Sequence, residues 1–210
     1  MDRYLKEIER HNIIELYESR YKQYGHNHKT VGWGSDLDQV LRFDMLCRGL
    51  DLKGKSILDL GCGLGDLVPY LEILTGGDFR YTGVDIAPVL VESAQNEFHH
   101  SNVKFVCCEM SSFSIKEKYD VAILSGALNY RIDDNIGFSE KIIDQLFRMT
   151  KESVAVNFLS SYADYQEKKN FHYSPEDMFK YSKLLSNWVT MYHDYPLWEF
   201  TIQINHNSFK

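Results

Sequence analysis

Cysteine and proline are scarce in this sequence, with four of each among 210 residues. No two of the cysteines Cys47, Cys62, Cys107 and Cys108 are spaced as C-x-x-C, a common arrangement in structural zinc sites. Adjacent cysteines are also poor partners for a normal disulfide with each other. The sequence therefore predicts reduced thiols and no metal site.

Targeting segments and long apolar runs are absent as well. The first ten residues, MDRYLKEIER, are charged and lack the apolar core of a signal peptide. No stretch approaches the ~18 apolar residues that a membrane-spanning helix needs. We therefore expect a cytoplasmic protein with no membrane partner.

A basic segment that would bind nucleic acid is missing too. The formal net charge is -7, so most of the surface repels a phosphate backbone. The strongest concentrations of positive charge are Lys168-Lys169 and the pair Lys180 and Lys183, which are small. We therefore expect no nucleic-acid partner and a small molecule as the ligand.

The composition is that of a globular domain, since 44% of the residues are hydrophobic and 25% are charged. We interpret residues 1–210 as one domain, either a monomer or a homodimer. A lid region, 1–52, precedes a core, 53–210. In the lid, apolar spacing predicts helices from Asp2 to Arg20 and from Asp36 to Leu50, with Asp36 as a cap and the loop Tyr21–Asp36 between them. The positions expected on the apolar faces are Leu5, Ile8, Ile13, Leu16 and Tyr17, then Leu37, Val40, Leu41, Met45 and Leu46.

From Lys55 onward, short apolar strands alternate with helices. Such alternation predicts an α/β fold, a Rossmann-like seven-stranded, mostly parallel sheet with helices on both faces. A short turn near Pro196 makes the last strand antiparallel, because a parallel return needs a crossover. The expected strands are Ser56–Leu60, Arg80–Asp85, Val103–Cys108, Tyr119–Leu124, Ser153–Leu159, Trp188–His193 and Glu199–Asn205, and the expected helices are Asp66–Leu74, Pro88–His99, Asn135–Met149 and Pro175–Leu185.

A glycine-rich turn follows the first expected strand, in the run Asp59-Leu60-Gly61-Cys62-Gly63-Leu64-Gly65-Asp66. Glycine permits the positive φ of a tight turn and lets the backbone approach a ligand closely. A dinucleotide-binding turn needs G-x-G-x-x-G, but the third position here is Asp66. The run reads D-x-G-x-G-x-G instead. Asp85 ends the next strand, where a carboxylate can accept hydrogen bonds from both hydroxyls of a ribose.

On these residues the chain resembles the class I S-adenosylmethionine-dependent methyltransferases. The stretches Gly32-Trp33-Gly34-Ser35 and Asn157-Phe158-Leu159-Ser160 extend the resemblance to small bacterial members of surface-polysaccharide or small-metabolite pathways. The resemblance implies S-adenosylmethionine as the cofactor and S-adenosylhomocysteine as the product, with Glu109 and Met110 near the adenine although Cys108 stands where the family usually has glycine. The cofactor contacts implied in the core are Asp59, Gly61, Cys62, Gly63, Asp85, Ile86, Glu109, Met110, Ser125 and Gly126.

The lid region is expected to fold over the cofactor and to add contacts from Tyr21, Trp33 and Arg42. Arg42 is the candidate partner of the cofactor carboxylate, because a guanidinium binds a carboxylate through two parallel hydrogen bonds. The alternative for Arg42 is a solvated charge on the second helix.

Methyl transfer is an in-line displacement, so the protein mainly positions the nucleophile and excludes water. A hydroxyl acceptor also needs a base, and the histidines considered are His26, His28, His172 and His193. Of these, His172 is the catalytic candidate, together with Asn129 and Tyr130, which follow the fourth strand.

An amine acceptor instead needs aromatic faces for its cationic product. Tyrosines near the expected mouth make such a cage possible, and Tyr24, Tyr162, Tyr173 and Arg131 are the candidate acceptor contacts. If the amine carries a phosphate, as in phosphoethanolamine, Arg131 and Lys168 or Lys169 are its candidate partners.

Three functions remain open at this point. The first is methyl transfer to oxygen or nitrogen of a small polar metabolite, such as a sugar, a nucleotide-linked sugar or a phosphorylated amine. The second is an NAD-dependent oxidoreductase, and the third is a non-catalytic domain that binds the cofactor.

Overall fold

Seven strands form a single sheet in the computed structural model, which describes residues 4–208. Their order across the sheet is β3-β2-β1-β4-β5-β7-β6, and β7 runs antiparallel to both β5 and β6, opposite to all the other strands. The predicted fold class, a mostly parallel seven-stranded sheet with an antiparallel last strand, is confirmed. The strands are β1 (Ser56–Leu60), β2 (Arg80–Asp85), β3 (Val103–Cys107), β4 (Tyr119–Leu124), β5 (Thr150–Leu159), β6 (Trp188–Tyr192) and β7 (Glu199–Asn205).

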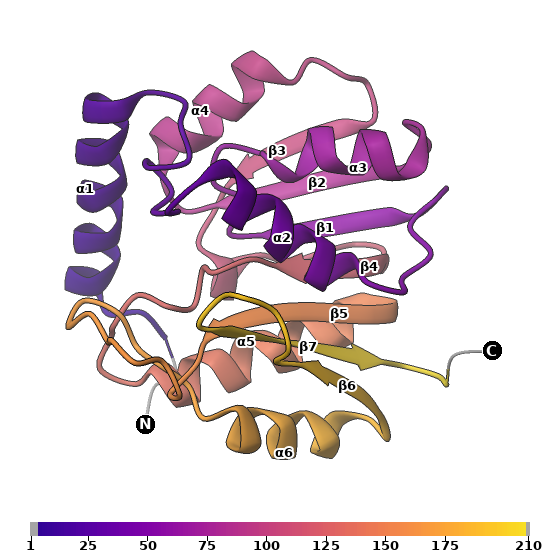
Figure 1. Cartoon of the computed structure of the whole chain (residues 1–210). Coiled ribbons are helices and arrows are strands. Elements are labelled where there is room, and N and C mark those ends of the chain that lie inside the picture. Colours follow the sequence, from indigo (N-terminus) through magenta and orange to yellow (C-terminus); the bar gives the residue numbers. More distant parts are fainter. Residues whose placement is uncertain (1–3, 209–210) are drawn as a thin grey trace.

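Helices cover both faces of the sheet, as Figure 1 shows. Consecutive residues of a strand point to opposite faces, so Ile57 and Leu58 of β1 belong to different apolar clusters. The Ile57 cluster includes side chains from α2 (Asp36–Cys47), α3 (Leu67–Thr75) and α4 (Pro88–Glu97). The Leu58 cluster includes side chains from α5 (Asn135–Met149) and α6 (Pro175–Leu185). The sheet is therefore the middle layer of three.

The first helix, α1 (Glu7–Tyr24), stands across the ends of the strands (Figure 1). It ends four residues later than the sequence predicts, and part of the expected start, residues 2–3, lies outside the described residues. The predicted apolar face is confirmed in part: Leu5, just before the helix, is buried, and Ile13 and Tyr17 pack against the apolar clusters, but Ile8 is 60% exposed and no residue of α1 is fully buried. A helix that crosses the end of a sheet, instead of lying along its face, buries only a narrow strip.

The second helix, α2, begins at Asp36 as predicted but ends at Cys47. Its cap is Ser35, whose hydroxyl accepts a hydrogen bond from the Asp38 backbone N–H at 3.1 Å, so the assignment of the cap to Asp36 was wrong. The predicted inward positions Leu37 and Val40 are exposed. The side that faces the sheet carries the buried residues Gln39, Arg42, Phe43, Leu46 and Cys47.

The remaining boundaries differ little from prediction. β5 begins three residues early, at Thr150, and the link from β3 to β4 holds only the short 3-10 helix η1 (Met110–Ser112). The carboxyl ends of β1 to β4 all lie at the end of the sheet that α1 crosses (Figure 1). None of the helices within residues 4–208 is long and apolar enough to span a membrane.

Candidate functional site

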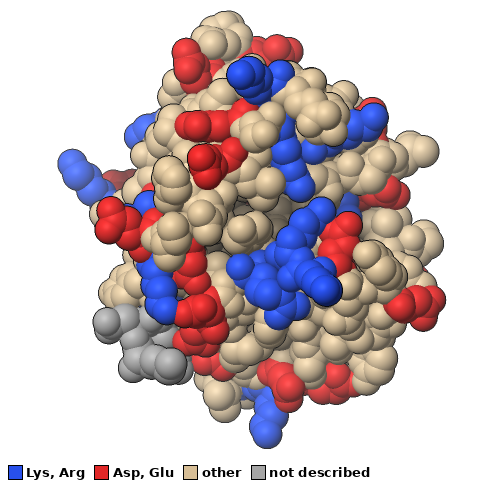
Figure 2. Space-filling model, turned by 90° about the vertical axis from the view of Figure 1, so that its left-hand side faces the viewer, with Lys and Arg blue, Asp and Glu red and all other residues tan. Residues whose placement is uncertain are grey.

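A cavity of about 1040 Å³, including its open mouth, lies where the strands β1 to β4 end. The glycine turn forms its floor, and α1 with the loop that follows closes it from above. Figure 2 looks onto this side of the molecule and shows a hollow there. The predicted site residues that line the cavity are Trp33, Asp59, Gly61, Cys62, Gly63, Asp85, Ile86, Glu109, Met110, Ser125, Gly126 and Tyr130.

The glycine turn is shaped by close approach of two neighbouring loops. Gly61 has a φ of 82°, and a Cβ there would lie 2.2 Å from the Cβ of Ala127. Gly63 has a φ of 55°, and a Cβ there would lie 2.8 Å from Cγ1 of Val31. At both positions a side chain is therefore excluded for two reasons: the backbone has a positive φ, and there is no space for a Cβ.

Asp59 is buried at the cavity floor with one oxygen engaged and one free. Its Oδ2 accepts a hydrogen bond from the Tyr81 hydroxyl at 2.6 Å. Its Oδ1 is buried and has no hydrogen-bond partner among the described residues. Burial raises the pKa of Asp59 to about 7. A buried carboxylate oxygen of this kind is a ready acceptor for a cationic N–H donor.

Asp85 is also buried, at the end of β2, and it orders the turn. Its two oxygens accept the backbone N–H groups of Gly63 and Ala87, each at 2.9 Å. Burial raises the pKa of this carboxyl. Tyr17 of α1 also lines the cavity, and burial together with the charge of Asp85 raises the pKa of its phenol to about 12. The lid thus presents a neutral hydroxyl near Asp85.

The loop after β4 brings Gly126 against Trp33. Gly126 has a φ of 72°, and a Cβ there would lie 2.3 Å from the Trp33 ring. Its backbone N–H donates to Oδ1 of Asn157 at 2.7 Å, while the neighbouring Ser125 hydroxyl is buried without a partner among the described residues. Contact between the Trp33 indole and Gly126 therefore sets the distance between the lid and the loop after β4.

Arg42 does not line the cavity, and its guanidinium is paired within the fold, so a contact with the cofactor carboxylate stays a prediction. Its Nε donates to Oε2 of Glu199 at 2.6 Å, and its Nη2 is bonded to Oε1 of the same carboxylate. Its guanidinium also stacks on Trp33, 3.9 Å from the ring centroid. Glu199 accepts a further hydrogen bond from Asn157 at 2.8 Å. Arg42 therefore supports the indole from behind.

Glu109 lines the cavity, but both of its oxygens already have partners. Arg10 of α1 donates to Oε2 through Nε at 2.8 Å and through Nη2, and the Ser111 hydroxyl donates to Oε1. The ion pair ties the lid helix to the segment that carries Met110. A contact between Glu109 and adenine stays a prediction.

Other predicted side chains lie away from the cavity lining. The Tyr21 hydroxyl bonds Ser93 of α4 at 3.1 Å, and Tyr24 is exposed. The Tyr162 hydroxyl bonds Glu176 at the surface. Tyr173 is buried in the core, where its hydroxyl donates to the Leu128 carbonyl at 2.8 Å. These tyrosines do not form a cage around an acceptor in this structure, because their side chains pack or bond elsewhere.

The three catalytic candidates do not lie together in the cavity. Tyr130 lines the cavity, whereas Asn129 and His172 do not. Asn129 uses its Oδ1 to accept the Leu159 N–H at 3.1 Å, which makes it a structural link. His172 has a buried Nδ1 without a partner among the described residues, and burial and nearby Arg131 lower its pKa. Arg131 uses its guanidinium on the carbonyls of Lys168 and Asn170.

Several lining residues were missed at the sequence level. Their half-buried or apolar character gave no reason to separate them from ordinary packing residues. Within residues 4–208, no group of three or more His, Cys, Asp or Glu side chains is placed to hold a metal ion. The missed lining residues include Leu5, Ile13, Tyr17, Val31, Gln39, Phe43 and Asp66.

Comparison with known proteins identifies the family of the chain that forms this cavity. A family described as "Methyltransferase domain" matches residues 51–204. The chain belongs to this methyltransferase family. "Putative methyltransferase Rv1506c" of Mycobacterium tuberculosis is 32% identical over 161 residues, which is 73% of this chain and 94% of that protein. A malonyl-[acyl-carrier protein] O-methyltransferase of Acetivibrio thermocellus is 37% identical over 100 residues, 46% of this chain and 35% of its own length.

The fold has solved counterparts. The magnesium protoporphyrin IX methyltransferase of Synechocystis PCC 6803, crystallised with S-adenosylhomocysteine, superposes with a TM-score of 0.69 at 14% identity. The match covers 94% of this chain and 99% of that one. Membership of the methyltransferase family, together with the glycine turn and the free carboxylate oxygen of Asp59, identifies S-adenosylmethionine as the cofactor and decides against the alternative of an NAD-dependent oxidoreductase.

Proposed function

We propose that this methyltransferase acts on a small polar metabolite, at nitrogen or oxygen, inside the cavity beneath α1. The observation that carries the proposal is the closure of the cavity by Tyr17 and Trp33 above the glycine turn. A concave, lidded site of this kind suits a small acceptor beside the cofactor better than a protein or nucleic-acid surface.

The residues present fit S-adenosylmethionine. The free Oδ1 of Asp59 can accept its ammonium group, and the backbone of Gly61 and Gly63 leaves room that any Cβ would fill. Asp85 can accept from the ribose hydroxyls with the lone pairs that Gly63 and Ala87 leave unused. When bound, the cofactor supplies an electrophilic methyl group on a sulfonium and its own leaving group.

The chain's part in the reaction is then to position the acceptor and exclude water. Trp33 and Tyr130 line the acceptor side, and Arg42 holds the indole in place. No histidine within residues 4–208 lines the cavity. An amine that is protonated at neutral pH and an alcohol both have to lose a proton, and the carboxyl groups of the lining, such as Asp66, and the phenol of Tyr130 are the candidate bases for either acceptor.

Two measurements test the proposal. We expect calorimetric titration to show that S-adenosylhomocysteine binds, and that Asp85→Asn weakens binding about tenfold or more while the exposed Glu92→Gln does not. Incubation with S-adenosylmethionine and paired small amines and alcohols should then give a methylated product. Binding without turnover of any acceptor would favour the non-catalytic alternative instead. A cytoplasmic location and a monomeric or dimeric state stay predictions.

A further inference from the structure

Positive charge gathers beside the mouth of the cavity, although the chain as a whole carries a net charge of -7. Figure 2 shows one group of Lys and Arg side chains next to the hollow, while other basic and acidic side chains are spread over the rest of this face. Charge of one sign beside a cavity in a protein of the opposite sign indicates a ligand, because it raises the local concentration of a counter-charged molecule.

One part of this charge, carried by Arg131, Lys168 and Lys169, lies next to the wall of the cavity. Tyr130 and Ile132 line the cavity, and Arg131 between them does not. Its backbone N–H donates to the Lys169 carbonyl at 2.9 Å, and its guanidinium donates to the carbonyls of Lys168 at 2.9 Å and Asn170 at 2.7 Å. These bonds hold Lys168 and Lys169 next to the cavity wall.

The other part comes from the lid. Arg20 of α1 lies over the ring of Tyr17, 5.9 Å from its centroid, and Tyr17 lines the cavity. A Cβ on Gly32 would lie 2.9 Å from Nη1 of Arg20, so the guanidinium sits directly against this glycine. Gly32 is flanked by Val31 and Trp33, both of which line the cavity. Arg20 is therefore at the edge of the mouth.

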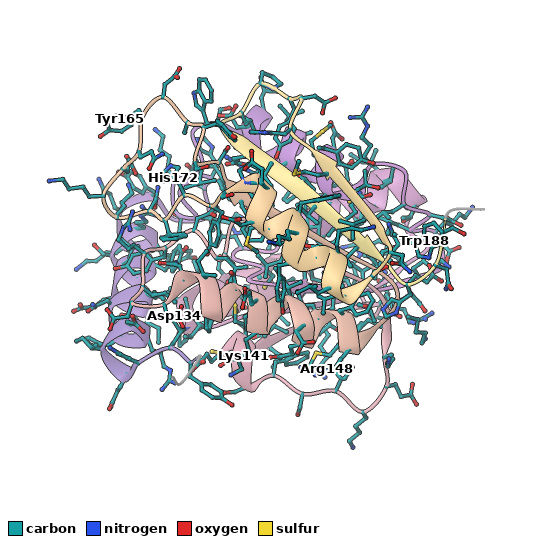
Figure 3. All side chains as sticks on the ribbon, turned by 90° about the horizontal axis from the view of Figure 1, so that it is seen from below. Asp134, Lys141, Arg148, Tyr165, His172 and Trp188 are labelled. Carbon is teal, nitrogen blue, oxygen red and sulfur yellow. The ribbon has the colours of Figure 1, made fainter. Side chains whose placement is uncertain are left out.

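We call Arg20, Arg131, Lys168 and Lys169 the cationic rim. Within residues 4–208 no carboxylate forms an ion pair with Arg20, Arg131 or Lys168, whereas Lys169 pairs with Glu167 at 2.7 Å. Elsewhere in residues 4–208, Arg10, Arg42, Arg48 and Arg148 (the last labelled in Figure 3) each have a carboxylate partner, whereas the exposed Arg80 has none. Arg131 and Lys168 are neighbouring like charges without a carboxylate partner among the described residues, and a bound anion relieves the repulsion between them.

We propose that the methyl acceptor carries a phosphoryl-type dianion, which binds to the cationic rim while the atom to be methylated reaches into the cavity. The proposal rests on the proposed function and names its substrate class. A dianion with three tetrahedral oxygens accepts from several donors at once, which matches a rim with arginines and lysines better than a carboxylate does.

The test uses the full chain saturated with S-adenosylhomocysteine and titrates it with inorganic phosphate. We expect phosphate to bind, with Lys168→Gln and Arg20→Gln each weakening binding about tenfold. Lys180→Gln on α6 is the matched control, since it removes an exposed lysine outside the rim, and it should change nothing. Affinity for S-adenosylhomocysteine itself should stay the same in all three variants, which shows that they fold.

Several outcomes would overturn the proposal. They are no phosphate binding, equal weakening in the Lys180 control, or acetate binding as tightly as phosphate, which would indicate a carboxylate acceptor. Binding of a short oligonucleotide far more tightly than phosphate would also contradict it. A chain that binds S-adenosylhomocysteine but not phosphate refutes only this inference, whereas a chain that binds neither refutes the proposed function. Methylation of aminoalcohol phosphates and not of the same aminoalcohols would then confirm the substrate class.

Discussion

At the scale of single residues, Asp59 is the most informative group in the site. It is buried in the cavity floor with its Oδ1 unpartnered among the described residues, and burial raises its pKa to about 7. A buried acid of this kind is costly to ionise unless a cation arrives. The unpartnered, buried Oδ1 is unfavourable for the protein without a ligand, and it gives an ammonium group a specific acceptor.

The affinity for S-adenosylhomocysteine should therefore depend on pH through Asp59. Below pH 7 the carboxyl is protonated in the free protein, so binding of an ammonium group must release that proton. We expect affinity to be constant above about pH 8 and to fall by up to about tenfold per pH unit below 7. Calorimetry between pH 5.5 and 8.5 measures this. Asp59→Asn should bind weakly with no such dependence, and a flat wild-type profile would show that Asp59 does not hold the ammonium group.

At the scale of elements, α1 is held to the core by few contacts. None of its residues is fully buried, and its most specific link is the ion pair between Arg10 and Glu109. Elements with few buried apolar contacts open more easily than the core strands. Because Ile13 and Tyr17 of α1 line the cavity, a weakly held lid suits entry of the cofactor.

Arg10→Ala should loosen the lid without unfolding the sheet. We expect amide hydrogens of α1 to exchange roughly threefold to tenfold faster than in the wild type, with β1 and β4 unchanged, because the lost pair is partly exposed. Hydrogen exchange followed by mass spectrometry measures both regions. Arg148→Ala, which removes a surface pair with Asp144 on α5, is the control. Unchanged exchange in α1 would mean that Tyr17, Tyr21 and their apolar neighbours hold the helix by themselves.

At the scale of the whole molecule, a buried ion pair joins α2 in the N-terminal region to β7, the last strand of the chain. Arg42 of α2 and Glu199 of β7 are 157 positions apart and both are buried. The pair also reaches the loop after β4, through Asn157 and Gly126. The region before residue 53 is thus not a simple lid, because α2 is part of the core.

Glu199→Gln should destabilise the whole fold, because it leaves the Arg42 guanidinium buried without a counter-charge. We expect the free energy of unfolding to fall by about 3–5 kcal/mol, measured by urea denaturation. Adding Arg42→Met should recover part of that loss. The surface variant Asp144→Asn should cost less than about 1 kcal/mol. A loss in Glu199→Gln as small as in the surface control would show that the buried pair contributes little.

The sequence by itself determined the sheet, the glycine turn and most of the cavity floor, because these depend on local patterns. Strand periodicity fixes which face each residue points to, and positive φ at Gly61 and Gly63 requires glycine whatever surrounds it. The tertiary structure decided the lid and the acceptor side. Whether Arg42 meets solvent, cofactor or Glu199, and whether Tyr173 meets an acceptor or the core, depends on partners far away in the chain. No local pattern encodes such pairings, since a charge or a phenol satisfies its hydrogen bonds wherever the fold brings a partner.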